Sequence, residues 1–269
     1  MESLNLDTMD AATALALLEW QLEMGVDEAL SDTPVDCYAL PDIAPWSPRA
    51  ARERAKAVPQ APVAVKGPDP LAEAETAAKS ASNLDELQAA MAAFDHCGLK
   101  RGARSLVFAD GNPQARVMVL GEAPGREEDA QGKPFVGAAG QLLDKMLGAI
   151  GLDRATDIAE SAVYITNVMP WRPPENRDPT PDEVAMMRPF LARHVELANP
   201  DLLILMGNFA CEATLGKRGI TRLRGQWTKA LGKPAMPMFH PAALLRRTEQ
   251  KRDAWADLLA IKARLRGDA

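Results

Sequence analysis

The sequence predicts an α/β protein, with a three-layer α/β/α domain around a short, mostly parallel sheet of four strands. Short apolar runs recur along the chain and end at glycine or polar residues, which is typical of strands that helices bury on both faces. Helical patterns, such as the one at 141–150, supply those covering layers. The predicted strands are Arg116–Leu120, Val163–Val168, Leu202–Met206 and a last strand near Met236–Phe239.

The first of these strands stops abruptly at a glycine-rich, acidic loop, residues 121–129. Gly121 and Gly125 allow backbone amides to point outward where the sheet ends, and Glu122 and Glu128 are expected to face the same crevice. The loop matches neither the Gly-x-Gly-x-x-Gly dinucleotide pattern nor a P-loop that ends in Lys-Ser or Lys-Thr. An ordinary strand-to-helix turn remains the alternative interpretation.

Three further segments end at residues that suit a binding crevice. Phe135 lies in a loop between two glycines, where its ring can form one wall of a flat pocket. Asn167 ends the second predicted strand, and its amide can recognise a donor–acceptor edge. His240 follows the last strand and precedes a proline. Because the carboxyl ends of parallel strands meet at one edge, we expect these residues to converge there.

In their order along the chain, these motifs resemble the uracil-DNA glycosylase superfamily, and most closely its family 4, which normally carries an iron–sulfur cluster. The resemblance covers roughly residues 84–265. It rests on Gly-Glu-Ala-Pro-Gly at 121–125, Gly-Lys-Pro-Phe-Val-Gly at 132–137, Tyr-Ile-Thr-Asn-Val at 164–168, Arg-Pro-Pro-Glu-Asn-Arg at 172–177 and His-Pro-Ala-Ala-Leu-Leu-Arg at 240–246. It implies a DNA repair enzyme that flips uracil out of DNA, hydrolyses the N-glycosidic bond and leaves an abasic site.

The resemblance also assigns roles to residues. It implies that Phe135 stacks on the flipped uracil, that Asn167 pairs with its Watson–Crick edge, and that His240 faces O2, where a donor stabilises the developing anion. Glu122 is expected to organise the site through Asn176 and His240. Glu128 is expected to hold the attacking water or, equally well, to be a charge at a helix N-terminus. The catalytic set is therefore Glu122, Glu128, Asn176 and His240, and the uracil-binding set is Gly121, Ala123, Phe135 and Asn167.

Ala123 occupies the place at which family 1 enzymes carry an aspartate near the attacking water, as is usual in family 4. The loop after His240 is expected to enter DNA, with Leu244 or Leu245 filling the space of the flipped base and Arg246 and Arg247 contacting DNA. Packing of the two leucines at a helix start is the alternative. Two basic groups could follow phosphates or form a solvated helix face: Arg218, Arg222 and Arg224, and Arg246, Arg247, Lys251 and Arg252.

The chain departs from family 4 at the cluster cysteines. The resemblance places the four cluster positions at Phe94, Cys97, Trp171 and Met187, of which one is a cysteine. One thiolate cannot hold a four-iron cluster. We therefore expect no iron–sulfur cluster, no metal and no other cofactor, and we expect the three large apolar side chains to fill the space as a buried plug, each contributing roughly 1.5–3 kcal/mol.

Composition divides the chain into two parts. Residues 1–66 hold 11 acidic and 5 basic side chains, whereas residues 67–269 hold 26 of each. We predict an acidic N-terminal extension (1–82) and a catalytic domain (83–269). The extension comprises a helix at about 8–24, which packs on the catalytic domain or docks a partner, and a Pro/Ala-rich linker to about residue 80. Beyond Cys97, the cysteines Cys37 and Cys211 offer no disulfide framework.

No apolar stretch approaches the roughly 20 residues of a membrane span, and no secretion signal is evident. We therefore expect a cytoplasmic monomer that acts on uracil-containing DNA, single- or double-stranded. Two other functions are consistent with parts of the sequence. A non-catalytic or retargeted member of the superfamily would bind deaminated or single-stranded DNA without efficient uracil release, and a metal-dependent nucleotide hydrolase would use the acidic loop. His96 and His194 are expected to be structural or solvated.

Overall fold

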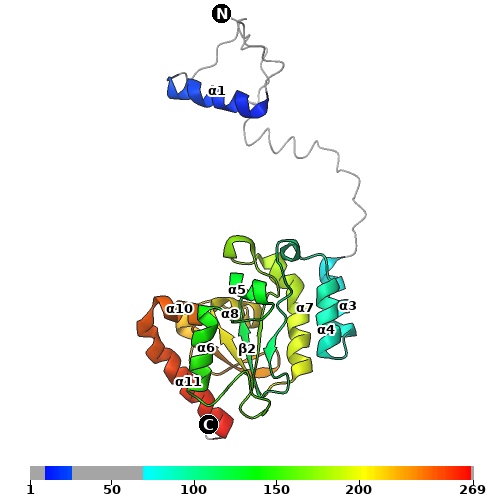
Figure 1. Ribbon diagram of the computed structural model, residues 1–269, viewed down its shortest axis with the longest axis vertical. Coiled ribbons are helices and arrows are strands. Elements are labelled where there is room, and N and C mark those ends of the chain that lie inside the picture. Colours follow the sequence, from blue (N-terminus) through cyan, green and yellow to red (C-terminus); the bar gives the residue numbers. More distant parts are fainter. Residues whose placement is uncertain (1–9, 26–68, 268–269) are drawn as a thin grey trace, which may run out of the picture. The chain divides into compact units, whose positions relative to one another are not determined.

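The computed structural model describes residues 10–25 and 69–267 and divides the chain into two compact units, Met1–Val65 and Lys66–Ala269 (Figure 1). Helix α1 (Ala11–Glu23) is the described element of the first unit. The Asp10 carboxylate caps it by accepting hydrogen bonds from the Ala12 and Thr13 amides. This confirms the predicted N-terminal helix. The predicted linker at 26–68, including Cys37, lies outside the described residues.

The boundary between the two units differs from the predicted one. Helix α3 (Pro70–Ser80) occupies the end of the predicted linker and belongs to the second unit. Asp69 caps α3 by accepting from the Leu71 amide, and Pro70 occupies the first helical position, where it begins a helix instead of breaking one. Ala74 and Ala78 are buried in the core, so the alanines form a packing face.

The sheet has six strands rather than the predicted four, in the order β1-β3-β2-β4-β6-β5. The four predicted strands form its parallel centre: β2 (Val117–Gly121), β3 (Val163–Asn167), β4 (Leu202–Met206) and β6 (Lys233–Met238). The two missed strands, β1 (Asp110–Gly111) and β5 (Thr228–Ala230), pair antiparallel at the edges. Both are too short to show a hydrophobic pattern.

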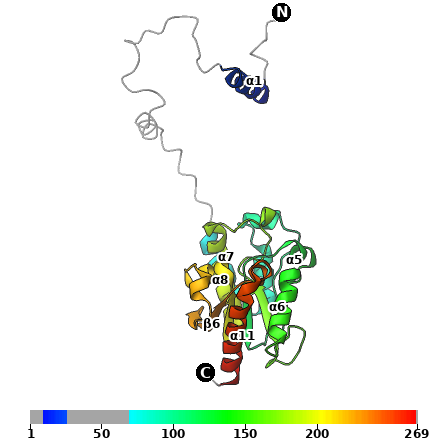
Figure 2. The ribbon, with the colours of Figure 1, turned by 90° about the vertical axis from the view of Figure 1, so that its left-hand side faces the viewer.

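Side chains of the central strands alternate between two cores, which gives the three layers. On one face, Met118 and Leu203 pack with residues of α4, α7 and α8. On the other, Val119 and Ile204 pack with residues of α6, α10 and α11. Figures 1 and 2 show these helices on opposite sides of the sheet. The helices are α4 (Leu84–Ala93), α5 (Arg126–Gln131), α6 (Ala138–Gly148), α7 (Pro181–Ala198), α8 (Gly207–Leu215), α9 (Ile220–Leu223), α10 (Pro241–Arg246) and α11 (Lys251–Arg266).

Three 3₁₀ helices complete the described elements: η2 (Gly98–Arg101), η3 (Pro174–Asn176) and η4 (Thr248–Gln250). The three-layer α/β/α fold class is thus confirmed, with the sheet extended at both edges. No helix among residues 10–25 and 69–267 is long and apolar enough to cross a membrane.

Candidate active site

The carboxyl ends of the parallel strands surround a cleft of about 640 Å³. β2 leads into the acidic loop, β3 ends at Asn167, β4 leads into Gly207, and β6 is followed by His240. Parallel pairing puts all four ends at one edge, so the predicted convergence is observed. All the predicted catalytic residues line this cleft together with three of the four uracil-binding residues: Glu122, Glu128, Asn176, His240, Ala123, Phe135 and Asn167.

The floor of the cleft is formed where Phe135 and Asn167 meet over Gly121. A Cβ atom at position 121 would overlap both the Asn167 side-chain oxygen and the Phe135 ring, so a glycine is needed there. The Phe135 ring stacks near the His240 imidazole, with centroids 5.4 Å apart. A flat aromatic face, an amide and an imidazole therefore border the same space, which suits a planar heterocycle with a donor–acceptor edge.

His240 is the N-cap of α10, and its Nδ1 accepts a hydrogen bond from the Ala242 amide at 3.2 Å. Burial, together with the positive charge of Arg246, lowers the pKa of His240 from 6.5 to about 4. The imidazole is therefore neutral at pH 7. Because Nδ1 is an acceptor, the single ring proton is on Nε2, so the ring offers one N–H donor.

Glu122 lines the cleft as a partly buried carboxyl group. Burial, and then the nearby charge of Asp178, raises its pKa, while Arg218 acts in the opposite direction. No hydrogen bond joins Glu122 to Asn176 or His240, although the three residues border the same space. The Asn176 side-chain oxygen instead accepts from Arg172 Nε at 2.8 Å. The resemblance implied that Glu122 organises the site through Asn176 and His240; in the structure the three residues line the same cleft without direct hydrogen bonds from Glu122 to the other two.

Glu128 lies in the first turn of α5, which is the helix N-terminal position given as its alternative, and its contacts extend beyond that helix. Its Oε1 accepts hydrogen bonds from the Val136 and Gly137 amides at 3.0 and 2.9 Å, and its Oε2 accepts from the Gly125 amide at 3.1 Å. The carboxylate therefore ties the acidic loop to the Phe135 loop. Three amide donors bind its two oxygens, so Glu128 fixes the geometry of both loops, and one of its roughly four acceptor sites stays open.

Comparison with known proteins identifies the family. The model of the uracil DNA glycosylase superfamily matches residues 108–259, more than half of the chain. The chain is 37% identical to the type-4 uracil-DNA glycosylase of Archaeoglobus fulgidus over 190 residues, which cover 66% of this chain and 92% of that protein. It is 42% identical to the Thermotoga maritima type-4 enzyme over 153 residues, covering 56% and 77%. The chain belongs to the uracil-DNA glycosylase superfamily.

The predicted resemblance to family 4 is confirmed by these relatives and by a third. The type-4 uracil-DNA glycosylase of Sulfurisphaera tokodaii is 36% identical over 173 residues, which cover 61% of this chain and 76% of that protein. Hydrolase, glycosylase, DNA-binding and DNA-repair functions follow at the level of the superfamily.

Of the two leucines in the segment expected to enter DNA, one is exposed to solvent and one is buried. Leu244 is 1% exposed and packs in the core of the α6, α10 and α11 layer. Of the two leucines predicted as candidates for DNA contact, Leu244 is therefore the one that follows the alternative interpretation of packing. Leu245, the next residue of α10, is 45% exposed. The helix turns one neighbour inward and the other outward. Arg246 lines the cleft, and Arg247 is exposed beside it.

The basic residues near 218–224 separate into different roles. Arg224 forms an ion pair with the buried Asp257 and donates to the Asp253 carbonyl oxygen, so it stabilises α11 and is not free to follow phosphates. Arg218 pairs with Glu212 but also lines the cleft. Arg222 is exposed. Asn208, which follows the predicted strand Leu202–Met206, also lines the cleft. The sequence motifs missed Asp178, which lines the cleft directly after the segment 172–177; reading that motif one residue further would have found it.

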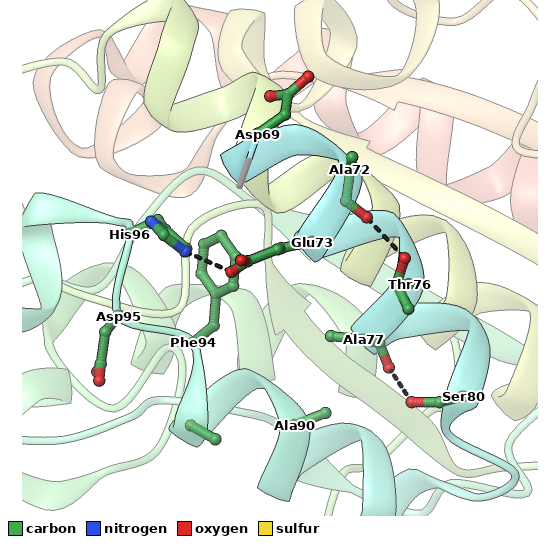
Figure 3. A pocket seen from close by; sticks show the side chains of 11 residues that line it. Asp69, Ala72, Glu73, Thr76, Ala77, Ser80, Ala90, Phe94, Asp95 and His96 are labelled. Atoms are coloured by element: carbon green, nitrogen blue, oxygen red, sulfur yellow. Dashed lines mark hydrogen bonds and ion pairs between the residues drawn. The ribbon is translucent and has the colours of Figure 1, made fainter. Parts of the chain in front are cut away.

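The four cluster positions lie in one hydrophobic core of the second unit. Phe94, Cys97, Trp171 and Met187 are all nearly inaccessible to solvent and belong to one core. Phe94 packs edge-on against Phe190, with ring centroids 5.4 Å apart. Figure 3 shows the Phe94 ring beside the Glu73–His96 pair, on the side of α3. We call Phe94, Cys97, Trp171 and Met187 the apolar corner.

The donor set of the apolar corner does not fit an iron–sulfur cluster. It contains one thiol, and burial raises the pKa of the Cys97 thiol, which disfavours the thiolate that a cluster needs. Among residues 10–25 and 69–267, no group of three or more His, Cys, Asp or Glu residues could hold a metal ion. His194 is structural: it is buried, it pairs with the Tyr164 hydroxyl at 2.9 Å, and it stacks on Phe108.

Proposed function

We propose that this protein excises uracil from single- or double-stranded DNA by hydrolysing the N-glycosidic bond, which leaves an abasic site. One observation carries the proposal: the Phe135 ring and the Asn167 amide meet over Gly121 and face a neutral His240 in one cleft. The names of the type-4 relatives support the same activity.

In this proposal the extruded uracil stacks on Phe135, and Asn167 pairs with its N3–H and O4. Cytosine presents the opposite donor and acceptor at this edge, so it would leave the amide unpaired at a cost of about 1–3 kcal/mol. The Nε2–H of His240 donates to uracil O2 as negative charge develops there. A fixed donor in a buried site needs no reorganisation during the reaction, which is why it favours bond cleavage.

Positive charge develops on the sugar while negative charge develops on the base. Glu122 and Asp178 are the carboxyl groups of the cleft whose oxygens accept no hydrogen bond from a backbone amide. Glu122 is half-buried and Asp178 is exposed, so we assign Glu122 to the cationic sugar and the attacking water. Glu128 is assigned a positioning role, because its oxygens bind three amides. Arg246 and the exposed Leu245 contact the DNA, Leu245 filling the gap left by the flipped base.

The direct test uses an end-labelled oligonucleotide with one uracil, followed by alkaline cleavage of abasic sites. The wild-type protein is expected to produce a strand break, and Asn167→Ala and His240→Ala are expected to lose most of it. His96→Ala is the matched control, because His96 lies outside the cleft beside Glu73. Intact uracil DNA after incubation with wild-type protein, in both strand forms and over a range of salt and pH, would overturn the proposal.

We further propose that the protein works without an iron–sulfur cluster, because the apolar corner offers one buried thiol where four thiolates are needed. Purified protein should contain no stoichiometric iron and show no visible cluster absorbance, and its activity should survive chelators. The triple substitution Phe94→Cys, Trp171→Cys and Met187→Cys supplies the missing ligands and is the positive control for iron uptake. Stoichiometric iron in the wild-type protein would contradict the proposal. A cytoplasmic location and a monomeric state remain predictions.

A further inference from the structure

The Phe135 backbone adopts a conformation that a bulky residue rarely takes. Its φ angle is +53°, in the left-handed region. This conformation turns the ring over Gly121 and toward His240, as the cleft requires. A strained residue keeps its geometry only when the surrounding structure imposes it. The contacts that hold the Phe135 loop therefore also hold one wall of the cleft.

Arg154 binds this loop through two consecutive backbone carbonyl groups. Its Nη1 donates to the Pro134 carbonyl oxygen at 3.0 Å, and its Nη2 donates to the Phe135 carbonyl oxygen at 3.0 Å. The planar guanidinium fixes the spacing and direction of these two bonds. A lysine ammonium, which is a point charge on a flexible stem, would not fix two neighbouring carbonyls in the same way.

Two carboxylates hold the guanidinium in place. Arg154 Nε donates to Asp144 of α6 at 2.8 Å, and Nη1 contacts Asp110 of β1 at 3.2 Å. The Arg154 side chain is 13% exposed and that of Asp110 is 19% exposed, so the bond between them is largely shielded from water, whereas Asp144 is 48% exposed. Arg154 thus connects an edge strand, a helix and the Phe135 loop, although it does not line the cleft itself.

The same peptide segment is held from two other directions. Glu128 accepts the amides of Val136 and Gly137, immediately after Phe135. The Phe135 carbonyl also lies directly against Gly140 of α6, where a Cβ atom would overlap it. A positive group therefore binds the carbonyls and a negative group binds the amides of one short loop, which leaves the Phe135 peptide little freedom to relax.

We propose that Arg154 is a positioning residue for base recognition: it holds Phe135 in its strained conformation and so sets the ring against which the flipped base stacks. The inference deepens the proposed uracil excision and rests on it. Arg154 lies behind the loop and outside the cleft. We therefore expect its substitution to weaken binding of the base and to leave binding of the DNA backbone unchanged.

The experiment compares Arg154→Gln and Arg154→Lys with the matched control Arg116→Gln. Arg116 makes the same kinds of contact, an ion pair with Asp201 at 2.6 Å and a bond to the Leu265 carbonyl oxygen at 3.3 Å, at the opposite ends of the strands. For each protein we would measure inhibition by free uracil, affinity for DNA with a stable abasic analogue, kcat, KM and thermal stability.

Arg154→Gln should weaken inhibition by free uracil by about tenfold, the change expected for one lost charge-assisted hydrogen bond, with affinity for abasic-analogue DNA unchanged. Arg154→Lys should fall between wild type and Arg154→Gln, and Arg116→Gln should match wild type in uracil inhibition. If Arg154→Gln loses stability to the same extent as Arg116→Gln and keeps wild-type inhibition by uracil, Arg154 is merely structural and the inference fails.

A second readout separates this inference from the proposed function. The Phe135 ring lies against Gly121, so its ring current should shift the NMR signals of the Gly121 α-protons. That shift should be lost in Arg154→Gln and kept in Arg116→Gln, whether or not the protein releases uracil. If the wild-type protein releases no uracil but the Gly121 shift is lost in Arg154→Gln and kept in Arg116→Gln, the proposed function fails. The positioning of Phe135 by Arg154 then still stands. An unchanged Gly121 signal in Arg154→Gln would overturn the positioning role alone.

Discussion

The cleft and the apolar corner lie in the same unit, Lys66–Ala269, and are held together by different interactions. In the cleft, polar side chains need defined partners, such as the Ala242 amide for His240 and three amides for Glu128. In the apolar corner, volume alone matters, because Phe94, Trp171 and Met187 pack without directed bonds. The segment from Trp171 to Asn176 connects the two. The comparison teaches that one unit supports its loops in two ways, by directed hydrogen bonds around the cleft and by packed volume in the apolar corner.

The largest expected effect comes from breaking the apolar corner. Trp171→Ala should lower the free energy of unfolding by about 3–5 kcal/mol, because a buried indole leaves a cavity. Urea unfolding measures this. Trp255→Ala is the matched control, since Trp255 is 44% exposed and should cost far less. Equal losses for the two variants would show that the corner contributes no special support.

Breaking the cleft should change the rate more than the stability, because His240 also caps α10 and losing a cap costs about 0.5–2 kcal/mol. His240→Ala removes the one imidazole donor of the cleft and should lower kcat for uracil release by about 10²–10³-fold. Single-turnover kinetics and thermal melting together test this. A melting temperature that falls as far as that of Trp171→Ala would mean that cleft and corner are not separable in this way.

A smaller effect should separate the two leucines of α10. Leu245→Ala should slow excision from double-stranded DNA by about tenfold, a part of the few kcal/mol that unstacking a base costs, and should leave single-stranded DNA and unfolding unaffected. Leu244→Ala should instead lower stability, because Leu244 is buried. If both strand forms slow equally in Leu245→Ala, the exposed leucine does not fill the stack.

The effect expected to be smallest near neutral pH is a dependence of stability on pH, and it grows as the pH falls. Burial lowers the pKa of His194 to about 3 and that of His240 to about 4, both from 6.5. Both imidazoles are neutral in the folded state, so above pH 6.5 their titration takes nothing from the free energy of unfolding. The free energy of unfolding decreases as the pH falls from 6.5 toward 4, where the unfolded chain binds more protons. His194→Gln keeps a partner for Tyr164 and should flatten this dependence; an unchanged slope in urea unfolding would contradict it.

Much of the fold could be predicted from the sequence, and the reasons differ between elements. The four central strands are long and apolar enough to show a pattern, whereas β1 and β5 are not. Helix α3 was missed because its alanines and prolines resemble a linker until α7 provides a surface to pack on. Leu244 and Leu245 are neighbours of one type, and the direction of α10 alone decides which is buried.

The predicted cleft residues came from motifs whose members lie close together in the sequence. Arg154 and the loop contacts of Glu128 could not be predicted this way. Arg154 reaches carbonyls 19 and 20 residues earlier, and Asp110 lies 44 residues away. Such bonds exist only once the strands are paired, so nothing in the local sequence marks an arginine as the partner of an aromatic loop.

Gly121 limits how the specificity of this site can change during evolution. Any side chain at position 121 would displace the Asn167 amide, the Phe135 ring or both, so mutation there cannot enlarge or reshape the pocket in small steps. Under the proposed function, new base preferences would therefore arise at residues that line the cleft, such as Asn167, or from altered support of the Phe135 loop. The second route changes residues that never touch the substrate, which makes the loop supports the more permissive starting points for directed evolution.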